Sequence, residues 1–323
     1  MSEKHRETSL GDETSVGWIT RRKLLKNGGF LATLAAAFGL GKAAASAPAV
    51  SQEVESLSDS MGTFFQKHYR RMSKEEVALA LERIQRDAKR KYDVDISVSN
   101  LPPIPGVIFG YALNLSRCKG YRKCVEACVA ENNQSRDPQI QYIRVLELDI
   151  GNDALNQGDH YYDAETVPRR GKYYLPMQCM QCSDPPCVKN CPVKATWMEP
   201  DGITVVDYNW CIGCRYCMTG CPYWARRFNW NAPTLDKKDI NPRTHYLGNR
   251  PRLKGVVEKC TFCIQRSRAG RLPACLEACP TGARVFGNLL DPMSEIRYVL
   301  ENKKVFRLKE EIGTEPKFWY YTD

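Results

Sequence analysis

One cysteine run limits the folds open to this chain more than any other feature of the sequence. It reads Cys211-Ile-Gly-Cys214-Arg-Tyr-Cys217-Met-Thr-Gly-Cys221-Pro222, a C-x2-C-x2-C-x3-C-P spacing. This spacing is typical of a segment in which three thiolates hold one iron–sulfur cluster while the fourth reaches a neighbouring cluster. The proline ends the short helix that carries the fourth cysteine. A zinc ribbon would instead need two well-separated C-x2-C pairs.

The sequence of 323 residues has 15 cysteines, and all of them fall in four runs of this kind, in numbers of 3 + 4 + 4 + 4. An odd total with no cysteine left over argues against a closed disulfide framework. The other three runs contribute Cys118, Cys124 and Cys128; Cys179, Cys182, Cys187 and Cys191; and Cys260, Cys263, Cys275 and Cys279. The sequence therefore predicts several iron–sulfur clusters, three of them [4Fe-4S].

The first run departs from the pattern because Tyr121 stands where a second cysteine is expected. A phenol is a weak ligand at neutral pH unless a metal lowers its pKa from about 10. Three thiolates suit a [3Fe-4S] cluster, which we favour here. A four-iron cluster with an unusual ligand and a site without a cluster, covered by the tyrosine ring, remain open.

The order of the runs predicts which cysteines share a cluster. Residues 202–207 read as a hairpin strand that links the second run to the third, so these two form one pair and the outer two runs the other. In two-cluster ferredoxins the fourth cysteine of each run binds the partner cluster. The expected sets are Cys179, Cys182 and Cys187 with Cys221; Cys211, Cys214 and Cys217 with Cys191; Cys260, Cys263 and Cys275 with Cys128; and Cys118 and Cys124 with Cys279.

The N-terminus reads as an export signal. Arg21-Arg22 precede an apolar run at 30–41 and a small-residue stretch at 43–49, the pattern of a twin-arginine signal peptide over residues 1–49. Twelve apolar residues are too few to span a bilayer comfortably. Because this route exports folded proteins, it suits a protein whose clusters are inserted in the cytoplasm, and it predicts a periplasmic location.

The remaining organisation predicts an α+β protein of tandem two-cluster ferredoxin-like modules. Residues 50–103 form a helical extension, with a capping box at 73–76. Residues 104–290 form the four-cluster domain, with an inserted loop at 224–254, and residues 291–323 a C-terminal arm. A strand is expected at 140–149. The aromatic side chains of the insertion are expected to shield clusters from water, with a docking surface as the alternative: Trp224, Phe228 and Trp230.

The four runs with these gaps, together with Cys279-Pro-Thr-Gly-Ala and Phe286-Gly-Asn-Leu289, resemble the four-cluster electron-transfer subunits of the dimethyl sulfoxide reductase superfamily. The resemblance covers roughly residues 104–290. It implies a line of clusters between a molybdenum catalytic subunit, or another redox protein, and a membrane quinone-reactive subunit. With its export signal the chain is similar to relatives that accompany hydrogenases, tetrathionate reductase, and membrane complexes with a polysulfide-reductase-type quinol subunit and multihaem cytochromes.

We therefore expect a periplasmic electron-transfer subunit of a respiratory complex that transforms no substrate itself. The main alternative is an enzyme whose three-cysteine cluster beside Tyr121 binds substrate. A colourless zinc- or disulfide-stabilised binding protein is a third class. The net charge of +10 fits a solvated surface, no nucleic-acid module is recognisable, and the four histidines are scattered: His5, His68, His160 and His245.

Overall fold

The computed structural model describes residues 72–323. The predicted signal peptide at 1–49, His5 and His68 lie outside the described residues. No helix among those described has both the length and the apolar character needed to cross a membrane.

Helix α4 (Lys74–Tyr92) begins where the capping box predicted it. The Ser73 hydroxyl accepts a hydrogen bond from the Glu76 N–H at 3.2 Å, and the Glu76 carboxylate accepts one from the Ser73 N–H at 2.8 Å. Two otherwise unpaired donors at the helix start are thereby satisfied. The helix ends at Asp93, which is left-handed, and it buries Ala80 and Ala88.

The other elements are short and alternate between helix and strand, which confirms the α+β class. The helices are α5 (Lys123–Glu131), η1 (Leu155–Gln157), α6 (Pro186–Lys189), α7 (Tyr216–Thr219), η2 (Lys237–Asp239), α8 (Ile264–Ser267), α9 (Ala274–Glu277), α10 (Glu295–Asn302) and η3 (Glu310–Ile312). The strands are β1 (Ser97–Ser99), β2 (Phe109–Asn114), β3 (Arg144–Asp149), β4 (Lys172–Met177), β5 (Thr196–Met198), β6 (Thr204–Val206), β7 (Arg226–Phe228), β8 (Arg243–His245), β9 (Val257–Lys259), β10 (Arg284–Asn288), β11 (Val305–Phe306) and β12 (Phe318–Tyr321).

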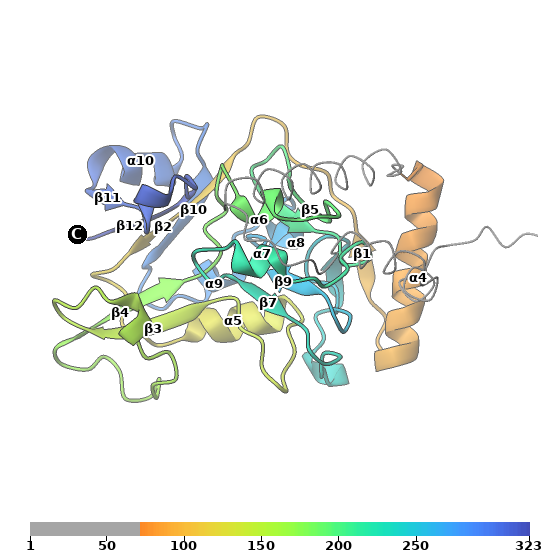
Figure 1. Ribbon diagram of the computed structural model, residues 1–323, viewed down its shortest axis with the longest axis horizontal. Helices are drawn as coiled ribbons and strands as arrows, with labels where there is room; N and C mark the ends of the chain where they lie inside the picture. The colour runs from red at the N-terminus through yellow and green to blue at the C-terminus, as the bar shows by residue number, and fades with distance from the viewer. Residues whose placement is uncertain (1–71) are drawn as a thin grey trace, which may run out of the picture. The chain divides into compact units, whose positions relative to one another are not determined.

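The largest sheet has the strand order β10-β2-β12-β11, with α10 packed against it (Figure 1). Strand β12 runs parallel to β2, and the other two pairings are antiparallel. The rings of Tyr111 and Phe318 stack at a centroid distance of 5.0 Å, and both side chains are fully buried. The segment expected as a C-terminal arm thus supplies two strands of this sheet.

Four two-stranded sheets complete the fold: β1-β8, β3-β4, β5-β6 and β7-β9. The hairpin β5-β6 lies where the second and third runs were expected to be linked. The strand predicted at 140–149 begins later, at Arg144, as β3. Residues 224–254 are not purely loop, because β7 pairs with β9 and β8 with β1.

Each cysteine run follows a strand and leads into a short helix. The strands that precede the runs are β2, β4, β6 and β9, and the helices within them are α5, α6, α7 and α9. Helix α5 packs against α9, and α6 packs against α7. The first run therefore meets the fourth, and the second meets the third.

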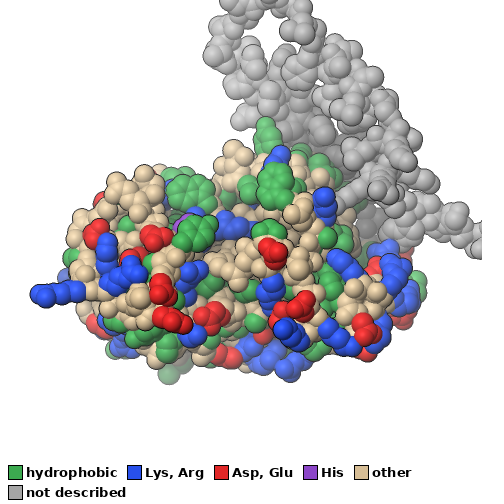
Figure 2. Space-filling view, turned by 90° about the horizontal axis from the view of Figure 1, so that it is seen from below, with side chains coloured by type: hydrophobic (Ala, Val, Ile, Leu, Met, Phe, Trp, Pro, Cys, Tyr) green, Lys and Arg blue, Asp and Glu red, His purple; other side chains and the backbone are tan. Residues whose placement is uncertain are grey.

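On the face shown in Figure 2, basic and acidic side chains are interspersed, with hydrophobic side chains between them. Mixed charge of this kind is typical of a solvated surface.

Candidate metal centres

The same backbone turn occurs in all four runs. The second residue after the first cysteine has a positive φ in each case: Gly120 (79°), Gln181 (46°), Gly213 (76°) and Phe262 (52°). Such angles are uncommon for residues other than glycine. A side chain at Gly213 would meet the carbonyl oxygen of Gly255 at 2.2 Å, which leaves room there for glycine alone. The repeated turn curls each run around the space that its sulfur atoms border.

The sulfur atoms gather in four groups, named here for the run that supplies most of each. They are group I (Cys118, Cys124, Cys279), group II (Cys179, Cys182, Cys187, Cys221), group III (Cys191, Cys211, Cys214, Cys217) and group IV (Cys128, Cys260, Cys263, Cys275). These are the sets expected from the sequence. None of the 15 cysteines forms a disulfide.

Charge interactions between sulfur atoms of different groups give the order of the groups. They join Cys124 of group I to Cys275 of group IV, Cys179 of group II to Cys260 of group IV, and Cys187 of group II to Cys217 of group III. The groups therefore follow one another in the order I, IV, II, III.

The two end groups are the more accessible ones. In group III the side chain of Cys214 is exposed, and in group I Cys118 and Cys279 are half-buried. All four cysteines of group IV are buried, and in group II only Cys187 is half-buried. The middle of the arrangement is thus more buried than its two ends.

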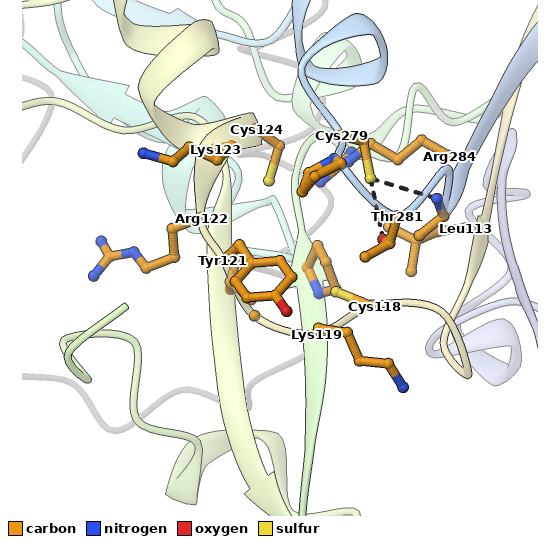
Figure 3. A pocket seen from close by; sticks show the side chains of 15 residues that line it. Leu113, Cys118, Lys119, Tyr121, Arg122, Lys123, Cys124, Cys279, Thr281 and Arg284 are labelled. Carbon is orange, nitrogen blue, oxygen red and sulfur yellow. Dashed lines mark hydrogen bonds between the residues drawn. The ribbon is translucent and has the colours of Figure 1, made fainter. Parts of the chain in front are cut away.

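Groups I and II each border a small pocket. Figure 3 shows the sulfur atoms of Cys118, Cys124 and Cys279 facing a common space, with the ring of Tyr121 at its edge. The charged ends of Lys119 and Lys123 point away from the three sulfur atoms (Figure 3). The Tyr121 side chain is 37% exposed, so it stands between this space and solvent.

Burial makes these thiols poor acids on their own. It raises the pKa of Cys118 to about 11 and that of Cys182 to about 12. The pKa of Cys128 is raised well above its ordinary value by burial and then by its group IV neighbours. A bound metal removes the proton from a coordinating thiol and so reverses this preference. These buried sulfur atoms would therefore become thiolates only when a metal binds them.

Hydrogen-bond donors point at several of the sulfur atoms, as expected for thiolates. The N–H groups of Ala195, Phe262 and Ala283 donate to the Sγ atoms of Cys191, Cys260 and Cys279 at 3.2, 3.4 and 3.4 Å. Gln134 Nε2 and Asn132 Nδ2 lie 3.3 and 3.6 Å from Cys128 Sγ. Bonds of this type stabilise the negative form of the sulfur and tune bound clusters.

Cys279 shows the effect of such donors. Burial alone would raise the pKa of its thiol, but hydrogen bonds from the Thr281 hydroxyl and from the N–H groups of Ala283 and Thr281 lower the pKa below its ordinary value. Figure 3 shows two of these bonds.

The sulfur atoms within each group are not placed as the ligands of a single metal ion would be. Zinc holds its sulfur ligands about 2.3 Å from the metal. Within the described part of the chain, no three His, Cys, Asp or Glu side chains are placed to hold one ion. A cubane separates its thiolates more widely, because each thiolate binds a different iron atom.

Two buried arginines beside the groups were not recognised from the sequence. Arg226 Nη2 lies 3.0 Å from Cys187 Sγ, and Arg284 Nη1 lies 3.3 Å from Tyr111 Oη, which is itself 3.4 Å from Cys275 Sγ. A signal for both was present, since each follows the last cysteine of its run by five residues.

The two tryptophans of the insertion lie at the surface, and their shielding of clusters stays a prediction. Trp224 and Trp230 are 46% and 61% exposed. Arg144 and Lys309 lie over the ring of Trp224, and Arg215 lies over that of Trp230. Because cations cover their faces, the rings can remain at the surface.

Comparison with known proteins agrees with this geometry. A 4Fe-4S dicluster domain model matches residues 171–252 and 245–289. The chain is 39% identical to the iron–sulfur subunit of a putative dimethyl sulfoxide reductase of Halobacterium salinarum, over 66% of this chain and 78% of that protein. It belongs to the iron–sulfur electron-transfer subunits of the dimethyl sulfoxide reductase superfamily.

Two further relatives agree with this family assignment. The Hdr-like menaquinol oxidoreductase iron–sulfur subunit 1 of Archaeoglobus fulgidus is 42% identical over 61% of the present sequence and 71% of its own length. One of the chains of the polysulfide reductase of Wolinella succinogenes is 38% identical over 65% of the present sequence and 92% of its own length. The expectation of an electron-transfer subunit of an oxidoreductase complex, rather than its catalytic subunit, is confirmed.

Proposed function

We propose that this subunit passes single electrons along four iron–sulfur clusters held by groups I, IV, II and III in that order. Groups II, III and IV would each hold a [4Fe-4S] cluster and group I a [3Fe-4S] cluster. The bound clusters would supply the one-electron chemistry. Groups I and IV then form one two-cluster module and groups II and III a second.

The observation that carries this proposal is the continuous line of sulfur groups with accessible ends. The buried cysteines of group IV keep water away from the middle of the line. Cys214 at one end and Cys118 at the other bring the terminal groups close to the surface, where redox partners could approach. The protein's own residues thus space the carriers and leave two points of exchange.

The proposed partners are a membrane quinone-reactive subunit of polysulfide-reductase type and a catalytic or cytochrome subunit. The relatives support this choice, because one is named for menaquinol, one for dimethyl sulfoxide and one for polysulfide. A molybdenum enzyme has this support; a hydrogenase and a multihaem cytochrome rest on the resemblance alone. The twin-arginine pattern around Arg21-Arg22 supports a periplasmic location. A substrate site beside Tyr121 is not favoured, since the relatives are electron-transfer subunits.

The cluster content can be tested on anaerobically purified subunit. Three four-iron clusters and one three-iron cluster total about 15 iron atoms per chain, with 16 sulfides. Electron paramagnetic resonance during stepwise reduction should resolve one three-iron and three four-iron species. A pale sample without iron or acid-labile sulfide would refute the proposal.

The grouping can be tested by exchanging single cysteines. Cys221 lies in the third run but in group II, so Cys221→Ser should disturb the same resonance as Cys182→Ser. Cys191→Ser, the matched change, should disturb the same resonance as Cys214→Ser. If Cys221→Ser instead reproduced the spectrum of Cys214→Ser, the grouping would be wrong.

A further inference from the structure

Two runs share an ending that goes beyond their cysteines. The third continues as Cys221-Pro-Tyr-Trp-Ala-Arg226 and the fourth as Cys279-Pro-Thr-Gly-Ala-Arg284, so an arginine occupies the fifth position after the last cysteine. The same position holds Asn133 in the first run and Thr196 in the second. Because the first run pairs with the fourth and the second with the third, each pair of groups receives one arginine.

Arg226 lies between groups II and III. Its side chain is 2% exposed, and Nη2 donates to Cys187 Sγ and to Thr196 Oγ1, both at 3.0 Å. Its Nε and Nη1 atoms are buried without a hydrogen-bond partner. The negative groups that interact with its charge are the sulfurs of Cys187, Cys217 and Cys179, which come from both groups.

Arg284 has the equivalent place between groups I and IV. Its side chain is 5% exposed, and Nη1 donates to Tyr111 Oη at 3.3 Å and to Gln178 Oε1 at 3.1 Å. Its Nη2 atom is buried and unpartnered. The sulfurs that interact with its charge are Cys124 of group I and Cys275 of group IV.

A buried guanidinium is costly unless negative charge compensates it. Here the compensating groups are cysteine sulfurs and whatever those sulfurs bind. A four-iron cluster with four thiolates carries net negative charge, and reduction adds one more negative charge. A fixed cation therefore favours the reduced form, and does so strongly where the effective dielectric is low.

We propose that Arg226 and Arg284 are positioning residues that raise the reduction potentials of the two clusters on either side of each. Arg226 acts on the clusters of groups II and III, and Arg284 on those of groups I and IV. The inference rests on the proposed function, because it needs clusters in all four groups. It adds that the subunit sets potentials in pairs, with one buried arginine for each pair.

The test is a redox titration of Arg226→Gln and Arg284→Gln in the whole subunit, followed by electron paramagnetic resonance with iron counted in parallel. Arg226→Gln should shift the redox equilibrium of groups II and III at least tenfold towards the oxidised form, a lowering of 59 mV for one electron. Groups I and IV should keep their potentials. Arg284→Gln should give the reciprocal pattern, so each variant is the matched control of the other.

Arg226→Lys and Arg284→Lys separate charge from hydrogen-bond geometry and should lower the same potentials by less than glutamine does. If glutamine variants lose iron while lysine variants keep it at near wild-type potentials, the charge is still required and the inference stands. Unchanged potentials in iron-replete glutamine variants, or equal shifts in all four clusters, would overturn it. Loss of iron from both variants at one position would also overturn it, by showing a structural role. Wild-type subunit without four clusters would instead refute the proposed function.

Discussion

At the scale of single residues, Tyr121 is the clearest departure from the repeat. The three other runs have Cys182, Cys214 and Cys263 at its position. Its ring borders the cavity of group I. A fourth thiolate at this point would complete the set, because only the second cysteine of the run is missing.

We expect Tyr121→Cys to convert the proposed three-iron cluster of group I into a four-iron cluster. Iron content should rise by about one atom per chain, and the resonance of the oxidised three-iron cluster should disappear. Tyr121→Phe is the control and should leave both unchanged. If the phenylalanine variant lost iron, the phenolic oxygen would be a ligand and group I would hold a four-iron cluster already.

His245 makes a second residue-level prediction. Its side chain is fully buried, its Nδ1 accepts a hydrogen bond from the Leu247 N–H at 3.1 Å, and its Nε2 lies 3.1 Å from the Leu101 carbonyl oxygen. Burial lowers the pKa of this imidazole to about 4. The ring is therefore neutral in the folded state, with its proton on Nε2.

Because the folded pKa of His245 lies below the unfolded value near 6.5, the unfolded state binds the proton first as the pH falls. Stability should be intact above pH 6.5, decline through the interval down to pH 4, and be lower by about 2 kcal/mol at pH 5. The measurement is the apparent unfolding midpoint against pH for wild type and His245→Gln. Identical pH profiles for the two proteins would contradict the prediction.

At the scale of elements, β12 (Phe318–Tyr321) is the strand on which the first run depends. It lies between β2 and β11, and β2 leads directly to Cys118. Phe318 stacks on Tyr111, whose hydroxyl contacts Cys275 Sγ. Damage to β12 should therefore reach groups I and IV.

We expect Phe318→Ala to lower the free energy of unfolding by about 3–5 kcal/mol, because a fully buried ring is replaced by a cavity. Iron should be lost from groups I and IV before groups II and III, as followed by their resonances during warming. Phe306→Ala in β11 is the control, since that ring is largely exposed and its removal should cost little. Simultaneous loss of all clusters would argue against this local dependence.

The elements also show what the sequence could and could not predict. The start of α4 and the β5-β6 hairpin depend on residues close together in the chain, such as Ser73 with Glu76. Because these signals are local, both elements could be predicted from the sequence. The cysteine grouping was accessible because ligand chemistry restricts both residue type and spacing.

The remaining features arise from contacts between distant segments. Nothing near Phe318 indicates that it will pair beside Tyr111, and nothing near Ser97 indicates that β1 will pair with β8. The sequence marks Arg226 only by its place five residues after Cys221, and its burial beside Cys187 arises from the fold. Partner choice across the sheet and burial of charge are tertiary effects that local propensity does not encode.

At the scale of the whole molecule, the order I, IV, II, III predicts that a break in the middle separates the two ends. Cys182→Ser removes a ligand of group II, so electrons entering at one end of the assembled complex should not reach the other. Rapid freeze-quench spectroscopy after addition of an electron donor for one end should show that end reduced and the far end oxidised. The wild-type complex is the control, and reduction of both ends of the variant at the wild-type rate would contradict the linear order.

The interleaving of the runs has a consequence for biogenesis. Every ligand of groups II and III lies between Cys179 and Cys221, whereas groups I and IV combine the first run with cysteines as late as Cys279. A ribosome that has released Cys221 has therefore made two complete ligand sets, while Cys118, translated much earlier, still lacks its distant partner. If clusters are inserted during synthesis, groups II and III would be filled before groups I and IV.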